Sequence, residues 1–213
     1  KCYDKSLELD PKFKLAWNNK GDALRRLDKK EEAIKCYDKA IELDPKYIRA
    51  WNNKGDALRR SGKHEEALEC FDKSIELDPK YIQAWRNKGN TFRDLGKHEE
   101  ALECLDKIIK LNPKNSHAWY NKGNHFLKLD KYEEALEYFE KALELDPKDS
   151  LAWHNKGVAL DDLDKNEEAL EYFDKAIELD PKYSAWWNNR GITLDKLGKP
   201  KEAIKCWDKA LEL

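Results

Sequence analysis

The side chains best suited to hold a ligand are asparagines that recur every 34 residues. They form an unbroken column made of Asn19, Asn53, Asn87, Asn121, Asn155 and Asn189. Asparagine is a mediocre helix former, so its repetition within helical segments must have another cause. Its amide carries a donor and an acceptor and could hold the backbone of a ligand. We favour this ligand role, on side chains expected to be exposed. The alternative is that the column bonds to neighbouring helices.

A second group of side chains lies beside this column and changes in character along the chain. The first half carries mainly arginine, whose planar guanidinium matches carboxylates. The second half carries apolar and aromatic residues near aspartates. We therefore predict a ligand surface that is basic at one end and apolar to acidic at the other, with an acidic ligand at the basic end. Its residues are Arg25, Arg59, Arg86, Asn90 and Arg93, followed by Tyr120, Asn124, His154, Val158 and Ile192.

The sequence shows no residues arranged for catalysis. It contains no Gly-rich phosphate loop and no nucleophile elbow. His117 and His154 could face the same groove, but no third ligand accompanies them to complete a metal site. We therefore predict that the protein is not an enzyme, has no catalytic residue and binds neither a metal ion nor a cofactor.

The cysteines share one column of the repeat. Equivalent atoms of neighbouring repeats should lie about 10 Å apart, the diameter of a helix. A disulfide requires Cα atoms within about 7 Å. We therefore expect free, packed thiols and a reducing, cytoplasmic location. These residues are Cys2, Cys36, Cys70, Cys104 and Cys206.

Composition argues against a nucleic acid or membrane partner. Lys and Arg total 41 against 43 Asp and Glu, which gives a net charge of -2. Such a balance provides no overall field to attract nucleic acid or an anionic membrane. No apolar run approaches the roughly 18 residues of a membrane span. The partner is therefore expected to be a protein or peptide, with no nucleic acid and no membrane.

A tryptophan and a glycine four residues later set the repeat. The tryptophans are Trp17, Trp51, Trp85, Trp119, Trp153 and Trp187, and the glycines are Gly21, Gly55, Gly89, Gly123, Gly157 and Gly191. A fixed period of this length predicts stacked supersecondary units rather than one globular core.

Further columns identify the repeated unit. A small residue such as Ala67 follows each glycine, then an aromatic residue such as Phe71, a second small residue such as Ser74, and a proline such as Pro79. This pattern resembles the tetratricopeptide repeat (TPR) family, in an array of prokaryotic type. The resemblance implies an all-α, right-handed superhelical solenoid of stacked antiparallel helix pairs. It also implies that the first helices line a concave groove for a peptide.

Two positions depart from the family pattern. Lys20, Lys54, Lys88, Lys122, Lys156 and Arg190 stand before the glycines, where the family has an apolar residue. We interpret these side chains as aliphatic stems that lie along the helices with their charges in water; a basic stripe is the alternative. In the third repeat, Ile108 occupies a small-residue position while Leu105 replaces the aromatic residue. Added volume beside removed volume is compatible with a packed interior.

We expect residues 1–213 to form a single solenoid. Residues 1–13 are the second helix of a partial repeat, and the last repeat, 184–213, lacks its closing loop. Full repeats occupy 14–47, 48–81, 82–115, 116–149 and 150–183. In the second repeat we expect helices over 48–60 and 64–77.

The leading functional prediction is a scaffold that binds a peptide segment in the concave groove. Some family members hold acidic tails in a carboxylate clamp, and Arg86, Asn90 and Asn121 align with its first part. Leu151 and Asn155 stand where bases are required, so the clamp is incomplete. The alternative is a structural array that associates end to end or extends a longer protein, because apolar residues of both terminal helices are expected to lack a covering repeat. These are Tyr3, Leu7 and Leu9, and Ile204, Trp207, Leu211 and Leu213.

Overall fold

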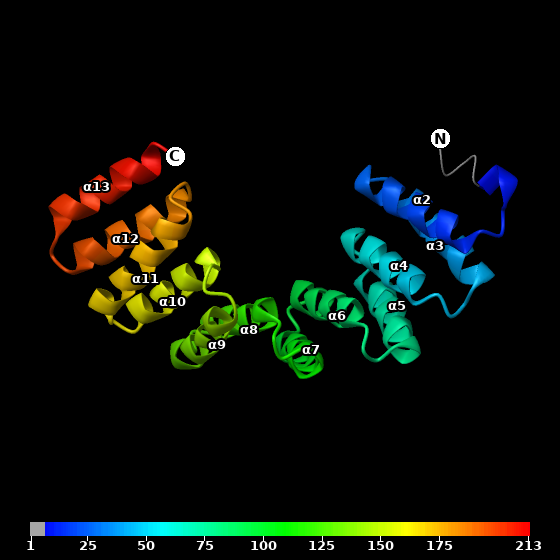
Figure 1. Ribbon diagram of the computed structural model, residues 1–213, viewed down its shortest axis with the longest axis horizontal. Coiled ribbons are helices and arrows are strands. Elements are labelled where there is room, and N and C mark those ends of the chain that lie inside the picture. The colour runs from blue at the N-terminus through cyan, green and yellow to red at the C-terminus, as the bar shows by residue number, and fades with distance from the viewer. Residues whose placement is uncertain (1–6) are drawn as a thin grey trace. The chain divides into compact units, whose positions relative to one another are not determined.

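The computed structural model describes residues 7–213, which form an all-α chain of helix pairs (Figure 1). Residues 1–6 of the partial repeat expected at the start of the chain lie outside the described residues. Leu7 is only 8% exposed, which corrects the expectation that it is uncovered. The chain divides into two compact units, residues 1–111 (unit 1) and residues 112–213 (unit 2). None of the helices among residues 7–213 is long and apolar enough to cross a membrane.

Each unit is a stack of helix pairs in which a first helix packs against the second helix that follows it. Each second helix also packs against the next first helix, and successive first helices touch. In unit 1 the helices are α2 (Lys14–Arg26), α3 (Lys30–Leu43), α4 (Ile48–Arg60), α5 (His64–Leu77), α6 (Ile82–Asp94) and α7 (His98–Leu111). In unit 2 they are α8 (Ser116–Leu127), α9 (Tyr132–Leu145), α10 (Ser150–Asp162), α11 (Asn166–Leu179), α12 (Ser184–Lys196) and α13 (Pro200–Leu211).

The turn inside each pair depends on one residue with a positive φ angle. Gly62 has φ 77° and Asp28 has φ 60°. Glycine adopts this conformation freely, and aspartate tolerates it better than most residues. The turn at Gly62 separates α4 from α5, whose bounds agree with the helices predicted over 48–60 and 64–77. The positions are Gly62, Gly96 and Gly198, and Asp28, Asp130 and Asp164.

Close approach between an aromatic ring and a glycine joins the two helices of most pairs. Phe71, which is fully buried, lies so close to Gly55 that a Cβ atom there would be 2.6 Å from its ring. The third repeat differs, because a Cβ atom added at Gly89 would lie 3.0 Å from the Cβ atom of Cys104 and would meet no ring. Ile108 is buried with 2% exposure in that repeat, which agrees with the expected compensation for Leu105.

This difference predicts unequal effects of the same substitution. Gly55→Ala and Gly89→Ala both gain helix propensity, up to about 1 kcal/mol. Only Gly55→Ala forces a buried ring to move, which typically costs about 1–3 kcal/mol. Urea unfolding should therefore show a larger loss of stability for Gly55→Ala than for Gly89→Ala. Equal losses would contradict the ring contact as the cause.

Candidate peptide-binding surface

The recurring tryptophan ties its helix to the loop before it. The indole Nε1 of Trp51 donates a hydrogen bond of 2.9 Å to the carbonyl oxygen of Pro45. The same bond occurs at Trp17, Trp85, Trp119, Trp153 and Trp187, each to the proline six residues earlier. The sequence showed both columns but gave no sign that they are bonded. The contact ties the start of each first helix to the loop before it, and so fixes the level of the side chains on that helix.

The basic residues before the glycines behave as aliphatic stems over aromatic rings. The Nζ atom of Lys54 lies 5.9 Å from the Trp51 ring centre and 2.7 Å from Asp38 on the preceding second helix. Arg190 makes the equivalent ion pair with Asp174 at 2.6 Å. The aliphatic stem of Lys54 lies along the helices as interpreted, but the charges of Lys54 and Arg190 pair with aspartates of the preceding helix and are not simply in water.

The asparagine column of unit 1 links the first helices of consecutive repeats. Asn53 Nδ2 donates to Asn18 Oδ1 at 3.1 Å, and Asn87 Nδ2 donates to Asn52 Oδ1 at 3.0 Å. We call each such bond, from an asparagine of the column to the residue 35 positions earlier, a rung. The acceptors Asn18 and Asn52 are buried, so each rung also satisfies a polar group removed from water.

Unit 2 has the same rungs with different acceptors. Asn155 Nδ2 donates to the Tyr120 hydroxyl at 3.1 Å, and Asn189 Nδ2 lies 3.0 Å from His154 Nε2. Four asparagines of the column are therefore bonded to the preceding repeat. This is the alternative that the sequence left open, and the ligand role of the column stays a prediction.

The burial of the column differs from what the sequence suggested. Asn19 is exposed, but Asn53, Asn155 and Asn189 are half-buried and Asn87 is only 7% exposed. The expectation of exposed asparagines is wrong for Asn87, because adjacent first helices touch at this position. The helical period identifies the face of a residue, but it does not show how close the neighbouring repeat lies.

Two of the predicted arginines also connect repeats. Arg25 Nη1 lies 3.0 Å from Asp56 on α4, and Arg59 Nη1 lies 2.7 Å from Asp94 on α6. Arg59 contacts Asp56 as well, at 3.3 Å. These half-buried guanidinium groups are largely neutralised within the protein, so a carboxylate ligand gains less from them.

Three other arginines keep their charge at the surface. Arg49 on α4 and Arg86 and Arg93 on α6 are exposed, and none has an ion pair among residues 7–213. Arg86 donates only a long hydrogen bond of 3.4 Å to Gln83, the residue equivalent to Arg49 in the next repeat. Asn90 is half-buried on the same helix. We call Arg49, Arg86, Asn90 and Arg93 the basic face of unit 1.

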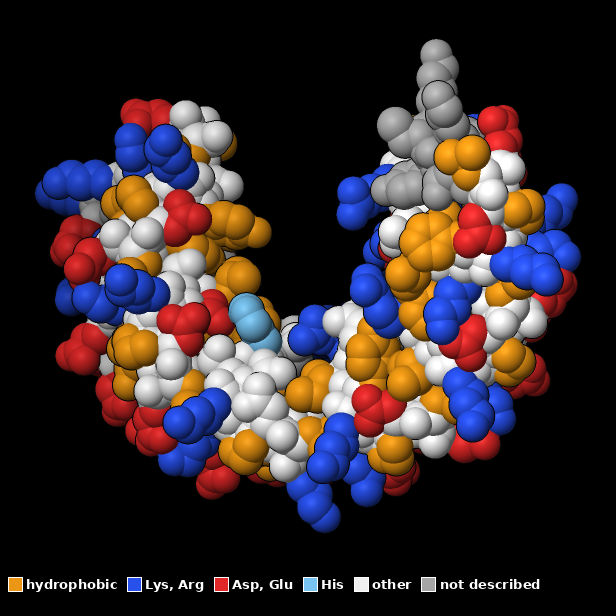
Figure 2. All heavy atoms as spheres, turned by 45° about the vertical axis from the view of Figure 1, so that its right-hand side comes forward, with side chains coloured by type: hydrophobic (Ala, Val, Ile, Leu, Met, Phe, Trp, Pro, Cys, Tyr) orange, Lys and Arg blue, Asp and Glu red, His pale blue; other side chains and the backbone are white. Residues whose placement is uncertain are grey.

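The corresponding surface of unit 2 is apolar. Leu151 on α10 is 43% exposed and Ile192 on α12 is 41% exposed. Val158, on the same helix as Leu151, is half-buried. Tyr120, Asn121 and Asn124 are half-buried on α8. Figure 2 shows Lys and Arg side chains mixed with Asp and Glu over both units, with apolar side chains between them. The predicted site residues thus gather in two separate sets, one on each unit.

His154 is held as a neutral ring inside the last rung. Its pKa is lowered from 6.5 because the ring is removed from water, although the bond to Asn155 opposes this shift. Nε2 accepts from Asn189, so the proton must be on Nδ1, which lies 3.0 Å from Asn155 Oδ1. Phe173 and Trp186 lie against the ring, with centroids 5.6 and 5.9 Å away.

The cysteines that the structure describes are buried and form no disulfide, as predicted: Cys36, Cys70, Cys104 and Cys206. Burial raises the pKa of the Cys70 and Cys104 thiols to about 11. Such thiols are protonated near neutral pH and unreactive. Cys2 lies outside the described residues.

Comparison with known families identifies the chain. Models of the tetratricopeptide repeat match residues 15–47, 48–81, 150–183 and 184–213, and another such model matches residues 86–150. The chain therefore belongs to the tetratricopeptide repeat family, whose fold serves as a protein-interaction scaffold. No curated protein matches the chain.

Solved structures support this assignment. A fragment of MamA from Desulfovibrio magneticus RS-1 is 27% identical with a TM-score of 0.71, and the match covers 78% of this chain and 94% of that one. YrrB, described as a TPR protein with an unusual peptide-binding site, is 26% identical with a TM-score of 0.65, covering 85% and 93%. Cut9 in complex with Hcn1, at 18% identity, a TM-score of 0.73 and coverage of 99% and 42%, shows the fold alone.

The rungs predict a contrast between two asparagines of the column. Asn87→Ala removes a buried hydrogen bond worth about 1 kcal/mol, whereas Asn19→Ala removes an exposed amide with no rung among residues 7–213. Both substitutions gain the same helix propensity. Urea unfolding should therefore show a net loss of stability only for Asn87→Ala. Equal stabilities would mean that the rung contributes nothing.

The neutral ring predicts a pH dependence of unit 2. The folded protein holds His154 with a lowered pKa, so the unfolded chain binds its proton more tightly. The contribution of His154 to stability is complete above about pH 6.5 and is lost as pH falls through the lower folded value. His154→Asn keeps an acceptor, as Asn52 does in unit 1. The difference between the melting temperatures of the two proteins should shrink or reverse from pH 7.5 to pH 5. A constant difference would show that the ring does not titrate in this range.

Proposed function

We propose that this protein is a scaffold that binds an acidic peptide segment of a partner protein on the basic face of unit 1. The observation that supports this proposal is the contrast between the two groups of arginines. Arg25 and Arg59 are neutralised by aspartates of neighbouring repeats, whereas Arg49, Arg86 and Arg93 are exposed without ion pairs among residues 7–213.

The positions of these arginines suit an extended ligand. Arg86 and Arg93 are two helical turns apart on α6, or about 10 Å, and therefore share a face. Arg49 lies on α4, which touches α6. Carboxylates spaced along a peptide could each accept two hydrogen bonds from a guanidinium group. The description of YrrB as a protein with a peptide-binding site supports peptide recognition as the mode.

The apolar surface of unit 2 is a separate part of the proposal. Leu151, Val158 and Ile192, with Tyr120 and His154, would contact aliphatic side chains of a ligand. The asparagines would contribute mainly by keeping the first helices in register. Asn19, the exposed member of the column, makes no rung among residues 7–213 and would present its amide to a ligand. Free thiols favour a cytoplasmic location. End-to-end association stays the alternative, and it rests on the exposure of Ile204, Leu211 and Leu213.

Charge reversal tests the basic face. Arg49→Glu with Arg93→Glu should weaken binding of acidic peptides from an array by at least about tenfold, because like charges then meet at the interface. Fluorescence anisotropy at two salt concentrations provides the measurement, and binding to the unaltered protein should weaken with added salt. The control is Lys35→Glu with Lys39→Glu, which makes the same change in charge on α3, the second helix of its pair. Equal binding by both double variants would rule out the basic face as the site.

A further inference from the structure

The second helix pair of unit 1 has a hollow beside its recurring tryptophan. The hollow has a volume of about 290 Å³ and is lined by residues of α4 and α5. This size is near the lower limit for ligand pockets and suits a single side chain. Leu58 and Cys70, which are 1% and 4% exposed, lie at its base, and Trp51 is half-buried beside them. Its lining residues are Trp51, Lys54, Leu58, Glu66, Glu69, Cys70 and Lys73.

The fifth repeat carries the same lining with one exception. Six of the seven residues recur there unchanged, and the seventh changes from Cys70 to Tyr172. The ring of Tyr172 lies 5.6 Å from that of Trp153 and packs against the cluster that contains Leu160. The Nζ atom of Lys156 lies 4.8 Å from the centre of the tyrosine ring. The chain itself thus shows what this lining holds, which is one aromatic ring beneath a cation. The unchanged residues are Trp153, Lys156, Leu160, Glu168, Glu171 and Lys175.

The fourth repeat gives a second example of a ring in this place. Tyr138 stacks on Trp119 and on Phe126, with ring centroids 6.1 and 5.2 Å apart, and Lys122 Nζ lies 4.7 Å from its ring centre. In the second repeat the side chain at this position ends at the thiol of Cys70, which behaves as a small apolar group. The place of the ring is therefore left open.

The charge that remains at the rim of the hollow is negative. Both lysines of the rim are neutralised, since Lys54 pairs with Asp38 at 2.7 Å and Lys73 pairs with Glu76 at 2.8 Å. Glu69 is exposed and has no ion pair among residues 7–213. A ligand that carries a cation next to its ring would complement this charge.

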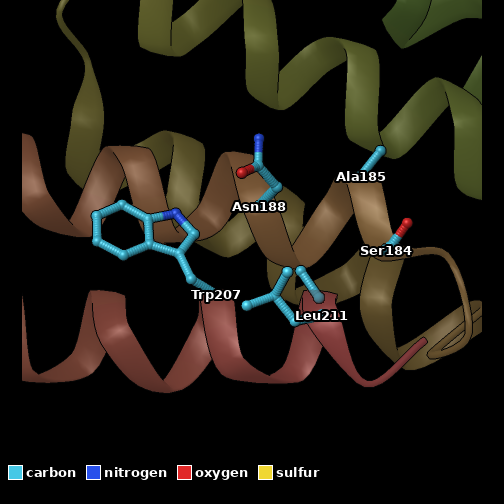
Figure 3. A pocket seen from close by; sticks show the side chains of 6 residues that line it. Ser184, Ala185, Asn188, Trp207 and Leu211 are labelled. Carbon is cyan, nitrogen blue, oxygen red and sulfur yellow. The ribbon is translucent and has the colours of Figure 1, made fainter.

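The hollow at the last helix pair is of a different kind. Ser184 and Asn188 on α12 and Trp207 and Leu211 on α13 are among the residues that line its volume of about 360 Å³ (Figure 3). In the preceding repeats of unit 2, the next first helix packs against the equivalent surface. The linings of the two hollows share no position of the 34-residue repeat. The hollow beside Trp51 is therefore not part of that stacking surface.

We propose that the hollow beside Trp51 binds an aromatic side chain of a partner protein, in a segment where Lys or Arg adjoins that side chain. The ring would take the place that Tyr172 fills in the fifth repeat, and the adjoining cation would reach Glu69. At about 100° per residue, Trp51 and Leu58 lie on the side of α4 opposite Arg49. The hollow is thus a second binding surface, separate from the basic face of unit 1.

An NMR titration of the isotope-labelled chain with N-acetyl-Lys-Tyr-Lys-amide tests the proposal. The indole N–H of Trp51, which is bonded to Pro45, belongs to a ring that lines the hollow. Its signal should shift saturably, with a dissociation constant on the order of 1 mM for so small a ligand. The same peptide with Ala in place of Tyr should leave the signal unchanged, which separates the effect of the ring from that of the charges.

Two substitutions at the variable position should have opposite effects. Cys70→Tyr supplies the ring from the chain itself and should weaken binding at Trp51 by at least about tenfold, because the space is then filled. Tyr172→Cys opens the equivalent place, so the indole signal of Trp153, unchanged in the unaltered chain, should then shift on titration. Glu69→Gln should weaken binding about twofold, as expected for an exposed ion pair. Melting curves would verify that each variant is folded.

Three results would overturn the proposal. The first is no saturable shift of the Trp51 signal. The second is an equal shift with the Tyr and Ala peptides, which would mean that charge alone is recognised. The third is a folded Cys70→Tyr variant that binds as well as the unaltered chain, or a folded Tyr172→Cys variant without a shift at Trp153. Acidic-peptide binding to the basic face uses other peptides and other variants, so either proposal can fail alone.

Discussion

The contact between first helices of consecutive repeats is the constraint on which the rest of the structure depends. A helix pair cannot bury its apolar face alone, so each repeat must stack on the next at a defined height. Apolar packing allows some sliding, whereas a hydrogen bond has a narrow range of distances. The rung from Asn87 to Asn52, at 3.0 Å and removed from water, sets that height. The ion pair of Arg59 with Asp94 then joins the same two helices, α4 and α6, about two turns further along. The ion pair of Arg25 with Asp56 joins α2 and α4 in the same way.

This constraint divides the polar residues of the first helices into two groups. Groups that hold repeats together are bonded and partly buried, and a ligand would have to break an existing contact to use them. Under the proposed function, Arg49 and Arg93, which have no such partner among residues 7–213, determine the charge that a ligand meets. Residue type alone does not separate these two groups, because both contain arginine and asparagine. Recognition in such an array is therefore set by the charges that remain after the contacts between repeats are made.

The parts of the fold that depend on local sequence could be predicted. Turn residues such as Gly62 and Asp28 follow from backbone conformation alone, and the bounds of α4 follow from periodicity and flanking residues. The role of the asparagine column could not be derived in this way. The acceptors of its rungs change from Asn52 to Tyr120 to His154, so no constant partner column draws attention to the bond. Whether an asparagine of the column bonds to the neighbouring repeat depends on the distance between the two repeats, and only the structure supplies that distance.

The acceptor of the rung differs from one repeat to the next, while the geometry of the bond stays the same. The contacts between repeats therefore differ in their chemistry. An amide or a hydroxyl acceptor keeps its character over the whole range of pH in which the protein is folded. The imidazole of His154 accepts only while Nε2 has no proton, and the bond from Nδ1 to Asn155 holds that tautomer. Stability in a repeat array is the sum of local terms, so a change in one rung acts first on the repeats that it joins. The contact between α10 and α12 is thus, among the rungs described, the one that a proton can weaken while the others are preserved.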